Sequence, residues 1–92
     1  MSEDQNIKKQ VSKNDIVLNK NRKLVLYNDD VNTFDYVIEC LVEICGHELV
    51  QAEQCAFITH YKGKCDVKSG DYRSMKRLKE HLVDRGLRVT ID

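Results

Sequence analysis

Hydrophobic and polar positions follow two rhythms along this chain, one typical of strands and the other typical of helices. Lys23 to Tyr27 is a short, largely apolar run that predicts a strand buried on at least one face. Apolar residues then recur every three or four positions on one face of a predicted helix, at Phe34, Val37, Ile38, Leu41, Ile44 and Cys45. Thr33 is a good N-cap for this helix, and Gly46 supplies a left-handed stop.

A second helix is predicted from Glu48 to His60, and Gly63 marks the turn that follows it. The side chains expected on its inward face are Leu49, Ala52, Cys55, Ala56 and Thr59. The next segment, Lys64 to Lys68, alternates charged and apolar residues like an exposed or edge strand, whose charges discourage edge-to-edge pairing.

The C-terminal third of the chain predicts one more helix and one more strand. Ser69-Gly70-Asp71 is typical of a turn followed by a helix cap, and the helix should stop at Gly86. The side chains expected toward the core are Tyr72, Met75, Leu78, Lys79 and Leu82. Leu87 to Ile91 alternates as a final half-buried strand. The order β-α-α-β-α-β predicts an α+β fold, a small three-stranded antiparallel sheet packed against three helices.

The first 22 residues differ in composition from the rest of the chain. They are rich in Lys, Asn, Gln, Asp and Ser, with only scattered apolar residues. Such a segment cannot bury enough apolar area to offset the entropy lost on ordering. We therefore expect a disordered, flexible N-terminal extension over residues 1–22 and a single folded domain over residues 23–92.

Charge and hydropathy exclude several classes of partner. Fifteen basic and fifteen acidic residues cancel, so no global field favours nucleic acid or an anionic membrane. No apolar run approaches the roughly 18 residues of a membrane span, and Met1-Ser2-Glu3-Asp4 is unlike a secretory signal. We expect a cytoplasmic protein whose partner is neither nucleic acid nor membrane.

Four cysteines raise the question of disulfides or zinc, but the chain contains no Cys-x-x-Cys pair. A zinc site built from Cys40, Cys45, His47 and His60 is conceivable, although Cys45-Gly46-His47 at a helix end is poor spacing for a closed tetrahedral site. Buried reduced thiols are the preferred interpretation, and no metal or other cofactor is expected.

Candidate chemistry gathers in two polar segments. Asn28-Asp29-Asp30 separates the first strand from the first helix, and His60-Tyr61-Lys62-Gly63-Lys64 ends the second helix. Taken alone, the first segment is typical of a turn with an N-cap, and a histidine near a helix end is typical of a cap or core partner. Together they offer carboxamide, carboxylate and imidazole acceptors, a compact set that suits a cation.

The two segments at this separation resemble the ClpS family, small adaptors that capture proteins by their N-terminal residue and hand them to a Clp protease. The similarity covers roughly residues 23 to 92 and is most specific in residues 26–30, 34–41 and 52–63. The chain departs from the family at Asn32-Thr33-Phe34, where Thr-Pro-Met is usual. The resemblance implies the same compact fold and a binding function rather than an enzymatic one, with no catalytic residues.

The resemblance also implies a site. The α-amino group would be held by Asn28, Asp29, Asp30 and His60, with Asp30 favoured for the closer contact and Asp29 for a water-mediated or capping role. The first side chain (Phe, Leu, Trp or Tyr) would enter a pocket lined by Asn32, Phe34, Val37, Ala56, Thr59 and Leu87. Methionine is common in the family where this chain has Phe34 and Ala56.

A second partner implied by the resemblance is the N-terminal domain of an AAA+ Clp unfoldase of the ClpA or ClpC type. The residues suggested for docking on it are Lys64, Asp71, Arg73 and Lys76. In the family, a flexible extension like residues 1–22 is associated with handing substrate to the unfoldase.

Two other functional classes stay open from the residues alone. An enzyme is disfavoured because no Ser or Cys sits in a nucleophile motif and no phosphate-binding glycine loop is present. A generic protein-interaction domain of similar fold, such as the C-terminal domain of a ribosomal stalk protein, would leave Asn28, Asp29, Asp30 and His60 without a shared purpose.

Overall fold

A computed structural model describes residues 21–92 of the protein. The predicted extension therefore lies outside the described residues except for its last two positions. The elements in chain order are β2 (Arg22–Tyr27), α3 (Phe34–Cys45), α4 (Leu49–Lys62), β3 (Lys64–Gly70), α5 (Tyr72–Asp84) and β4 (Arg88–Ile91). This order and an antiparallel three-stranded sheet confirm the predicted fold class.

The sheet is built around β2. Its strand order is β3-β2-β4, so the central strand pairs with an antiparallel neighbour on each side. Leu24, Val25 and Leu26 in the middle of β2 are almost completely buried, which agrees with the strand predicted to be buried on at least one face. Strand β3, predicted as an exposed or edge strand, lies at an edge of the sheet. It extends to Gly70, two residues beyond its predicted end at Lys68.

A β-bulge interrupts the pairing of β2 with β3. Leu24 pairs with Lys68 and Val25 with Asp66, so Val67 has no partner in the register. Val67 is nevertheless buried within the core. The extra residue breaks strict alternation in β3 and increases its local twist.

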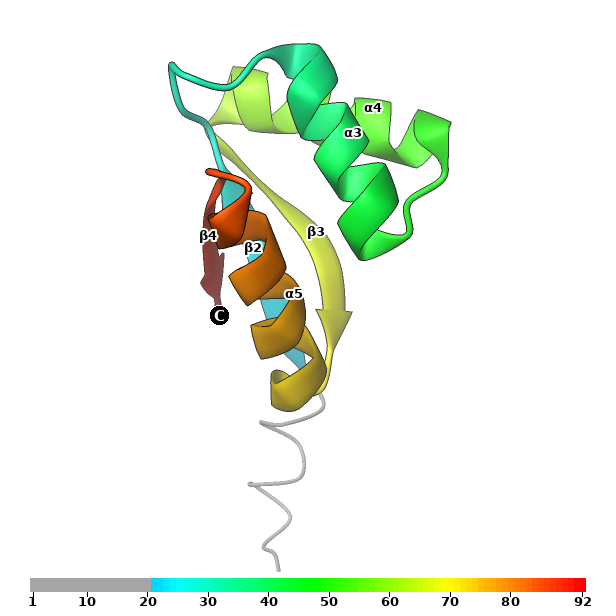
Figure 1. Cartoon of the computed structure of the whole chain (residues 1–92), viewed down its shortest axis with the longest axis vertical. Coiled ribbons are helices and arrows are strands. Elements are labelled where there is room, and N and C mark those ends of the chain that lie inside the picture. The colour runs from blue at the N-terminus through cyan, green and yellow to red at the C-terminus, as the bar shows by residue number, and fades with distance from the viewer. Residues whose placement is uncertain (1–20) are drawn as a thin grey trace, which may run out of the picture.

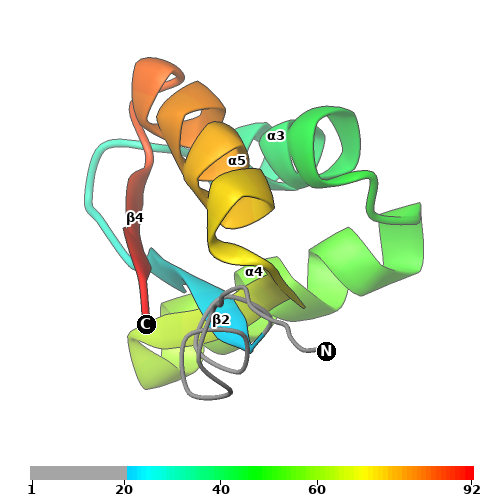
Figure 2. The ribbon, with the colours of Figure 1, turned by 90° about the horizontal axis from the view of Figure 1, so that it is seen from below.

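The three helices cover the sheet in a chain of contacts. Helix α5 packs against the sheet, and α3 contacts both α5 and α4 (Figures 1 and 2). The core fills the space between them, and its largest fully buried side chains are Leu24, Leu26, Leu41, Leu82, Val25 and Cys40. The end of α4 thus lies close to the end of β2, where the polar loop begins (Figure 1).

Local signals account for the helix boundaries. The hydroxyl of Thr33 accepts a hydrogen bond from the backbone N–H of Tyr36 at 3.1 Å, and α3 ends at Gly46 with φ of 71°. Helix α4 runs to Lys62, two residues beyond the predicted end at His60, and Gly63, with φ of 92°, follows it as the cap. Positive φ at both positions is inexpensive only without a Cβ atom.

Two side chains predicted to face the core do not. Leu49, the first residue of α4, is 60% exposed. Tyr72 is 39% exposed, and its ring instead lies 5.0 Å from the guanidinium carbon of Arg22. Helical periodicity predicts which face a residue shares but not how far the neighbouring element extends.

Candidate functional site

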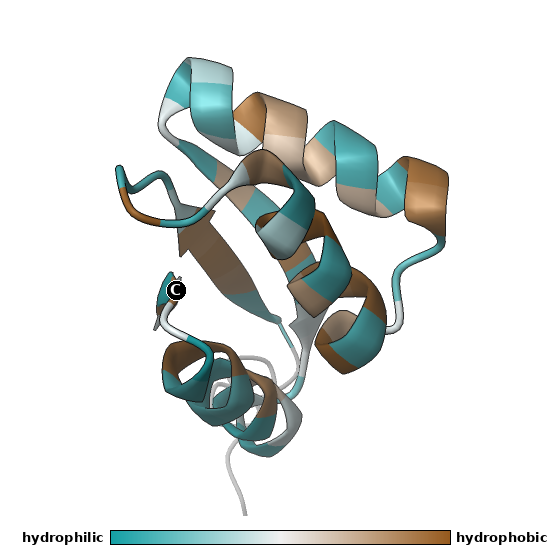
Figure 3. Cartoon of the chain, turned by 45° about the horizontal axis from the view of Figure 1, so that its top comes forward, coloured by the Kyte–Doolittle hydropathy of each residue, from teal (hydrophilic) through white to brown (hydrophobic). Residues whose placement is uncertain are grey.

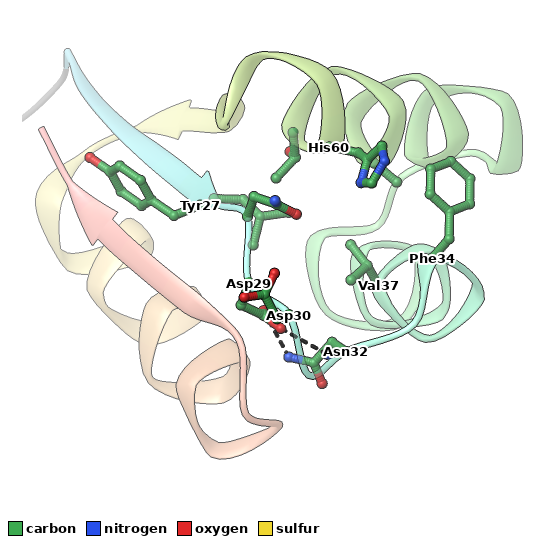
Figure 4. Close-up of a pocket in the computed structure, with 11 residues that line it drawn as sticks. Tyr27, Asp29, Asp30, Asn32, Phe34, Val37 and His60 are labelled. Carbon is green, nitrogen blue, oxygen red and sulfur yellow. Dashed lines mark hydrogen bonds between the residues drawn. The ribbon is translucent and has the colours of Figure 1, made fainter.

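A cavity of about 390 Å³ lies where the end of β2, the loop before α3 and the end of α4 meet (Figure 4). Its volume is within the range typical of ligand pockets, about 300–1,000 Å³. The lining residues are Leu26, Tyr27, Asn28, Asp29, Asp30, Asn32, Phe34, Val37, Ala56, Thr59 and His60. Polar groups gather on the loop and at His60, while apolar groups come from the two helices and β2.

Backbone pairing brings the two predicted polar segments together. The N–H of Asn28 donates to the carbonyl of Gly63 at 2.9 Å, which carries the pairing of β2 one residue beyond its end. Gly63 follows the last turn of α4, the turn that contains His60. This bond therefore fixes Asn28 beside the helix end that supplies the histidine.

The loop after Asn28 is organised by Asp29. One carboxylate oxygen accepts from the backbone N–H groups of Val31 and Asn32 at 2.8 and 2.7 Å, and the other accepts from the Asn32 side-chain amide at 2.9 Å. Partial burial alone would raise the pKa of Asp29, but hydrogen bonds from Asn32 and Val31 outweigh it, so the pKa is lowered. Asp29 therefore holds the loop. Capping is one of the two roles that the sequence analysis suggested for it.

Asn32 connects this loop to a distant part of the chain. Its side-chain amide also donates to the carbonyl of Gly86 at 3.0 Å, in the turn that precedes β4. Nearby, the hydroxyl of Tyr36 donates to the carbonyl of Arg85 at 2.8 Å. Two bonds therefore join the loop and the start of α3 to the end of α5.

Three potential hydrogen-bond acceptors at the cavity are not used by other groups of the described residues. Within residues 21–92, the side chains of Asn28, Asp30 and His60 make no hydrogen bond, and all three residues are exposed. His60 is oriented by Tyr61, whose ring meets it edge-on at a centroid distance of 5.4 Å. The cavity therefore presents a carboxamide, a carboxylate and an imidazole to solvent.

The remainder of the cavity wall is apolar. Phe34 and Val37 face it from α3, and Ala56 from α4 (Figure 4). Thr59 also lines the cavity, but its hydroxyl already donates to the carbonyl of Cys55 at 2.7 Å within the same helix. Ala56 and Thr59 are 3% and 5% exposed, whereas Phe34 at the rim is 43% exposed.

The structure gathers most of the predicted site but not all of it. All four predicted amine-binding residues and five of the six predicted pocket residues line the cavity. Leu87 is absent from the lining because it packs in the core, 3% exposed, where its N–H donates to the carbonyl of Leu82. Leu26 and Tyr27 line the cavity although sequence analysis missed them, and their position directly before Asn28 was the available signal.

The predicted docking residues are all exposed, but they differ in setting. Lys64 opens β3, whereas Arg73 and Lys76 lie on α5. Asp71 caps α5, and the backbone N–H of Ser74, at 2.9 Å, is the main cause of its lowered pKa. Asp71 therefore has a structural function whether or not it also contacts a partner.

The four thiols are free, three buried and Cys65 partly buried. Burial raises the pKa of Cys45 to about 11, and burial together with the neighbouring Cys55 raises that of Cys65 to about 12. Among the described residues, no three His, Cys, Asp or Glu side chains are close enough to hold a metal ion. The conceivable set of Cys40, Cys45, His47 and His60 accordingly does not assemble into a zinc site.

Comparison with known proteins shows the family of the chain. The family model described as "ATP-dependent Clp protease adaptor protein ClpS" matches residues 18–90, most of the chain. The chain belongs to the ClpS family. ClpS proteins are adaptors rather than enzymes, which agrees with the absence of a nucleophile motif in the sequence.

Individual relatives add detail. The ClpS adapter protein of Campylobacter jejuni strain 81-176 is 44% identical over 41 residues, and that of strain RM1221 matches equally. The match covers 45% of this chain and 43% of the relative, so it spans less than half of the relative's length. The structure of Agrobacterium tumefaciens ClpS2 bound to L-phenylalaninamide is similar in fold, with a TM-score of 0.76 at 19% identity over 80% of this chain and 96% of the other.

Among residues 21–92, no helix combines the length and apolar character needed to cross a bilayer. Some of the exposed apolar side chains of these residues, Phe34, Val50, Phe57 and Ile58, line a groove that is described below.

Proposed function

We propose that this ClpS protein recognises the free N-terminal residue of substrate proteins and delivers them to a Clp unfoldase for degradation. The observation that carries the proposal is the position of the uncommitted acceptors Asn28, Asp30 and His60 at the mouth of an apolar cavity. A free N-terminus has the matching features on one carbon atom. Its ammonium group can bind the acceptors, and its side chain can enter the cavity.

The acceptors suit an ammonium group electrostatically. An α-amino group has a pKa near 7.7 to 8.0 and is mostly charged at neutral pH. Charge-assisted hydrogen bonds to such a group are worth roughly 1.5 to 3 kcal/mol each. An acetylated terminus has lost both the charge and two donors, so the same acceptors would be left partly unsatisfied. The site should therefore distinguish free from blocked termini.

The cavity suits a bulky apolar side chain, the class Phe, Leu, Trp and Tyr. Burial of such a side chain contributes about 1.5 to 3 kcal/mol. Val37, Ala56 and Thr59 offer a wall without an unpaired polar group, and the Phe34 ring at the rim can contact an aromatic guest. L-Phenylalaninamide, bound in the A. tumefaciens ClpS2 structure, carries both an α-amino group and a benzyl side chain.

Delivery requires a second surface. We propose that the N-terminal domain of a ClpA-type or ClpC-type unfoldase contacts one or more of the exposed residues Lys64, Asp71, Arg73 and Lys76. The predicted extension, without Arg22 because that residue belongs to β2, would serve as the arm that engages the unfoldase, because its composition is rich in polar residues. We place this activity in the cytoplasm, a reducing compartment that suits four free thiols.

A direct test is fluorescence anisotropy with two labelled peptides that differ only at the terminus, one beginning with Phe and one with acetyl-Phe. The unblocked peptide should bind and the acetylated peptide should not. Asn28→Ala, Asp30→Ala and His60→Ala should each weaken binding by about 1.5 to 3 kcal/mol.

Matched controls lie on α5, away from the cavity. His81→Ala and Asp84→Ala remove exposed side chains of the same chemical types, so peptide affinity should stay unchanged. Equal binding of the blocked and unblocked peptides would disprove recognition of the N-terminus. Unchanged affinity in all three site variants, with circular dichroism intact, would disprove the site assignment.

A further inference from the structure

A second hollow, of about 580 Å³, lies on the outer surface between α3 and α4. Its apolar lining residues are Phe34, Ile38, Val50, Phe57 and Ile58. Four of them keep between 39% and 64% of their surface exposed to solvent, and Ile38 is half-buried. Figure 3 shows apolar segments that alternate with polar ones along α4. We refer to this feature as the α3/α4 groove.

The groove lies next to the proposed binding cavity, because Phe34 lines both. Aromatic rings link their linings a second time, since Phe57 packs against Tyr61 at a centroid distance of 4.4 Å and the Tyr61 ring lies 5.4 Å from that of His60. A peptide held at His60 by its amine would therefore have its next residues within reach of the groove.

The length of the groove matches a short stretch of peptide. Val50, Phe57 and His60 lie along α4, and ten residues separate the first from the last. At about 1.5 Å per helical residue, this is about 15 Å. An extended chain covers about 3.3 to 3.6 Å per residue, so roughly four residues span it.

The charges in the groove disfavour a second copy of this chain as its occupant. Asp35 and Glu53 line the groove, and no basic side chain of the described residues does so. A two-fold contact of the groove with itself would bring these carboxylates close to their own counterparts. A neutral, apolar peptide segment has no such penalty.

We propose that the α3/α4 groove binds the residues that follow the first residue of a captured N-terminus. The inference rests on the proposed function and extends the substrate class. Preferred substrates begin with a bulky residue and continue with apolar side chains at their second to fourth positions. The first residue is then necessary for binding, and the next residues set the affinity.

The test uses two Phe-start peptides, one continuing with Gly-Ser-Gly and one with Leu-Val-Leu, each also prepared with an acetylated terminus. The wild-type protein should bind the apolar continuation about three- to tenfold more tightly. Val50→Ser, which lies farthest from His60, should reduce this preference toward unity without changing affinity for the Gly-Ser-Gly peptide. Phe57→Ser should also reduce the preference. Val83→Ser, an equally apolar and 47% exposed position on α5, should retain the preference.

Three outcomes would overturn the proposal. They are equal affinities for the two continuations, a preference that survives in both groove variants, and a preference for the apolar continuation that persists in the acetylated peptides. A dimer that Val50→Ser dissociates while the peptide preference stays unchanged would assign the groove to a second copy. Failure of the Gly-Ser-Gly peptide to bind at all would instead contradict the proposed function, so the two failures are distinguishable.

Discussion

Asp29 accepts hydrogen bonds from both the backbone N–H and the side-chain amide of Asn32, at 2.7 and 2.9 Å. These bonds occupy both carboxylate oxygens, whereas the adjacent Asp30 makes no hydrogen bond within the described residues. Two neighbouring carboxylates that look alike in the sequence thus have different tasks. One shapes the loop, and the other is available to a ligand.

The two aspartates should respond differently to substitution. Asp29→Ala removes a cap that satisfies two backbone N–H groups, so the free energy of unfolding should fall by about 0.5 to 2 kcal/mol. Asp30→Ala should change stability by less than about 0.5 kcal/mol but weaken binding of a Phe-start peptide by about 1.5 to 3 kcal/mol. Urea unfolding and peptide anisotropy separate the two effects. A reversed pattern would mean that the assigned roles are exchanged.

The lowered pKa of Asp29 also predicts a dependence of stability on pH. A carboxyl group with a lower pKa in the folded than in the unfolded state stabilises the fold above about pH 4, and this stability is lost as pH falls through the folded-state value. The stability difference between wild type and Asp29→Asn should therefore be present at pH 7, on the order of 0.5 to 1 kcal/mol given solvent screening. It should shrink below pH 4.

A matched measurement on Asp84→Asn gives the background for this comparison, because Asp84 is exposed at the end of α5. It is made over the same range, from pH 7 to pH 3. If the Asp29→Asn difference stays constant over that range, the carboxylate form is not what holds the loop.

The thiols should react slowly in the folded protein. With pKa values raised to about 11 and 12, Cys45 and Cys65 hold little thiolate at pH 8, and the thiolate is the reactive form. Alkylation by iodoacetamide, followed by mass spectrometry, should be at least about 100-fold slower in the folded state than in denaturant. Similar rates in both states would show that the environment of these thiols does not suppress ionisation.

A larger side chain at position 56 should change which N-terminal residues the cavity accepts. Ala56→Met inserts side-chain volume into the cavity, and overpacking costs about 1 to 3 kcal/mol. β-Branched Ile-start and Val-start peptides should lose more affinity than Phe-start ones, because their bulk lies closest to the backbone. An equal loss for all three, or no loss, would mean that position 56 does not face the guest side chain.

The extension can be tested by removing residues 1–20, a cut that keeps Arg22 in β2. Residues 21–92 contain every described element and every cavity-lining residue, so affinity for a Phe-start peptide should stay within about twofold. Degradation of a Phe-start reporter protein by the Clp unfoldase and protease should be abolished. Full-rate degradation by the truncated protein would show that residues 1–20 take no part in delivery.

Local chemistry made much of this structure predictable. Thr33 and Asp71 cap helices and Gly46 ends one, as expected, because these effects act within one turn of backbone. The bulge at Val67 and the exposure of Leu49 depend on partners far away in the chain, which periodicity does not report. Leu87 was placed in the pocket by analogy, yet its position depends on packing between the end of α5 and the sheet.

The bond from Asn32 to Gly86 spans 54 residues of chain. The entropy of closing so long a loop opposes such a contact until other contacts offset it. One anchor of the loop therefore lies in the turn just before β4. A chain emerging from the ribosome lacks this anchor until Gly86 has been made.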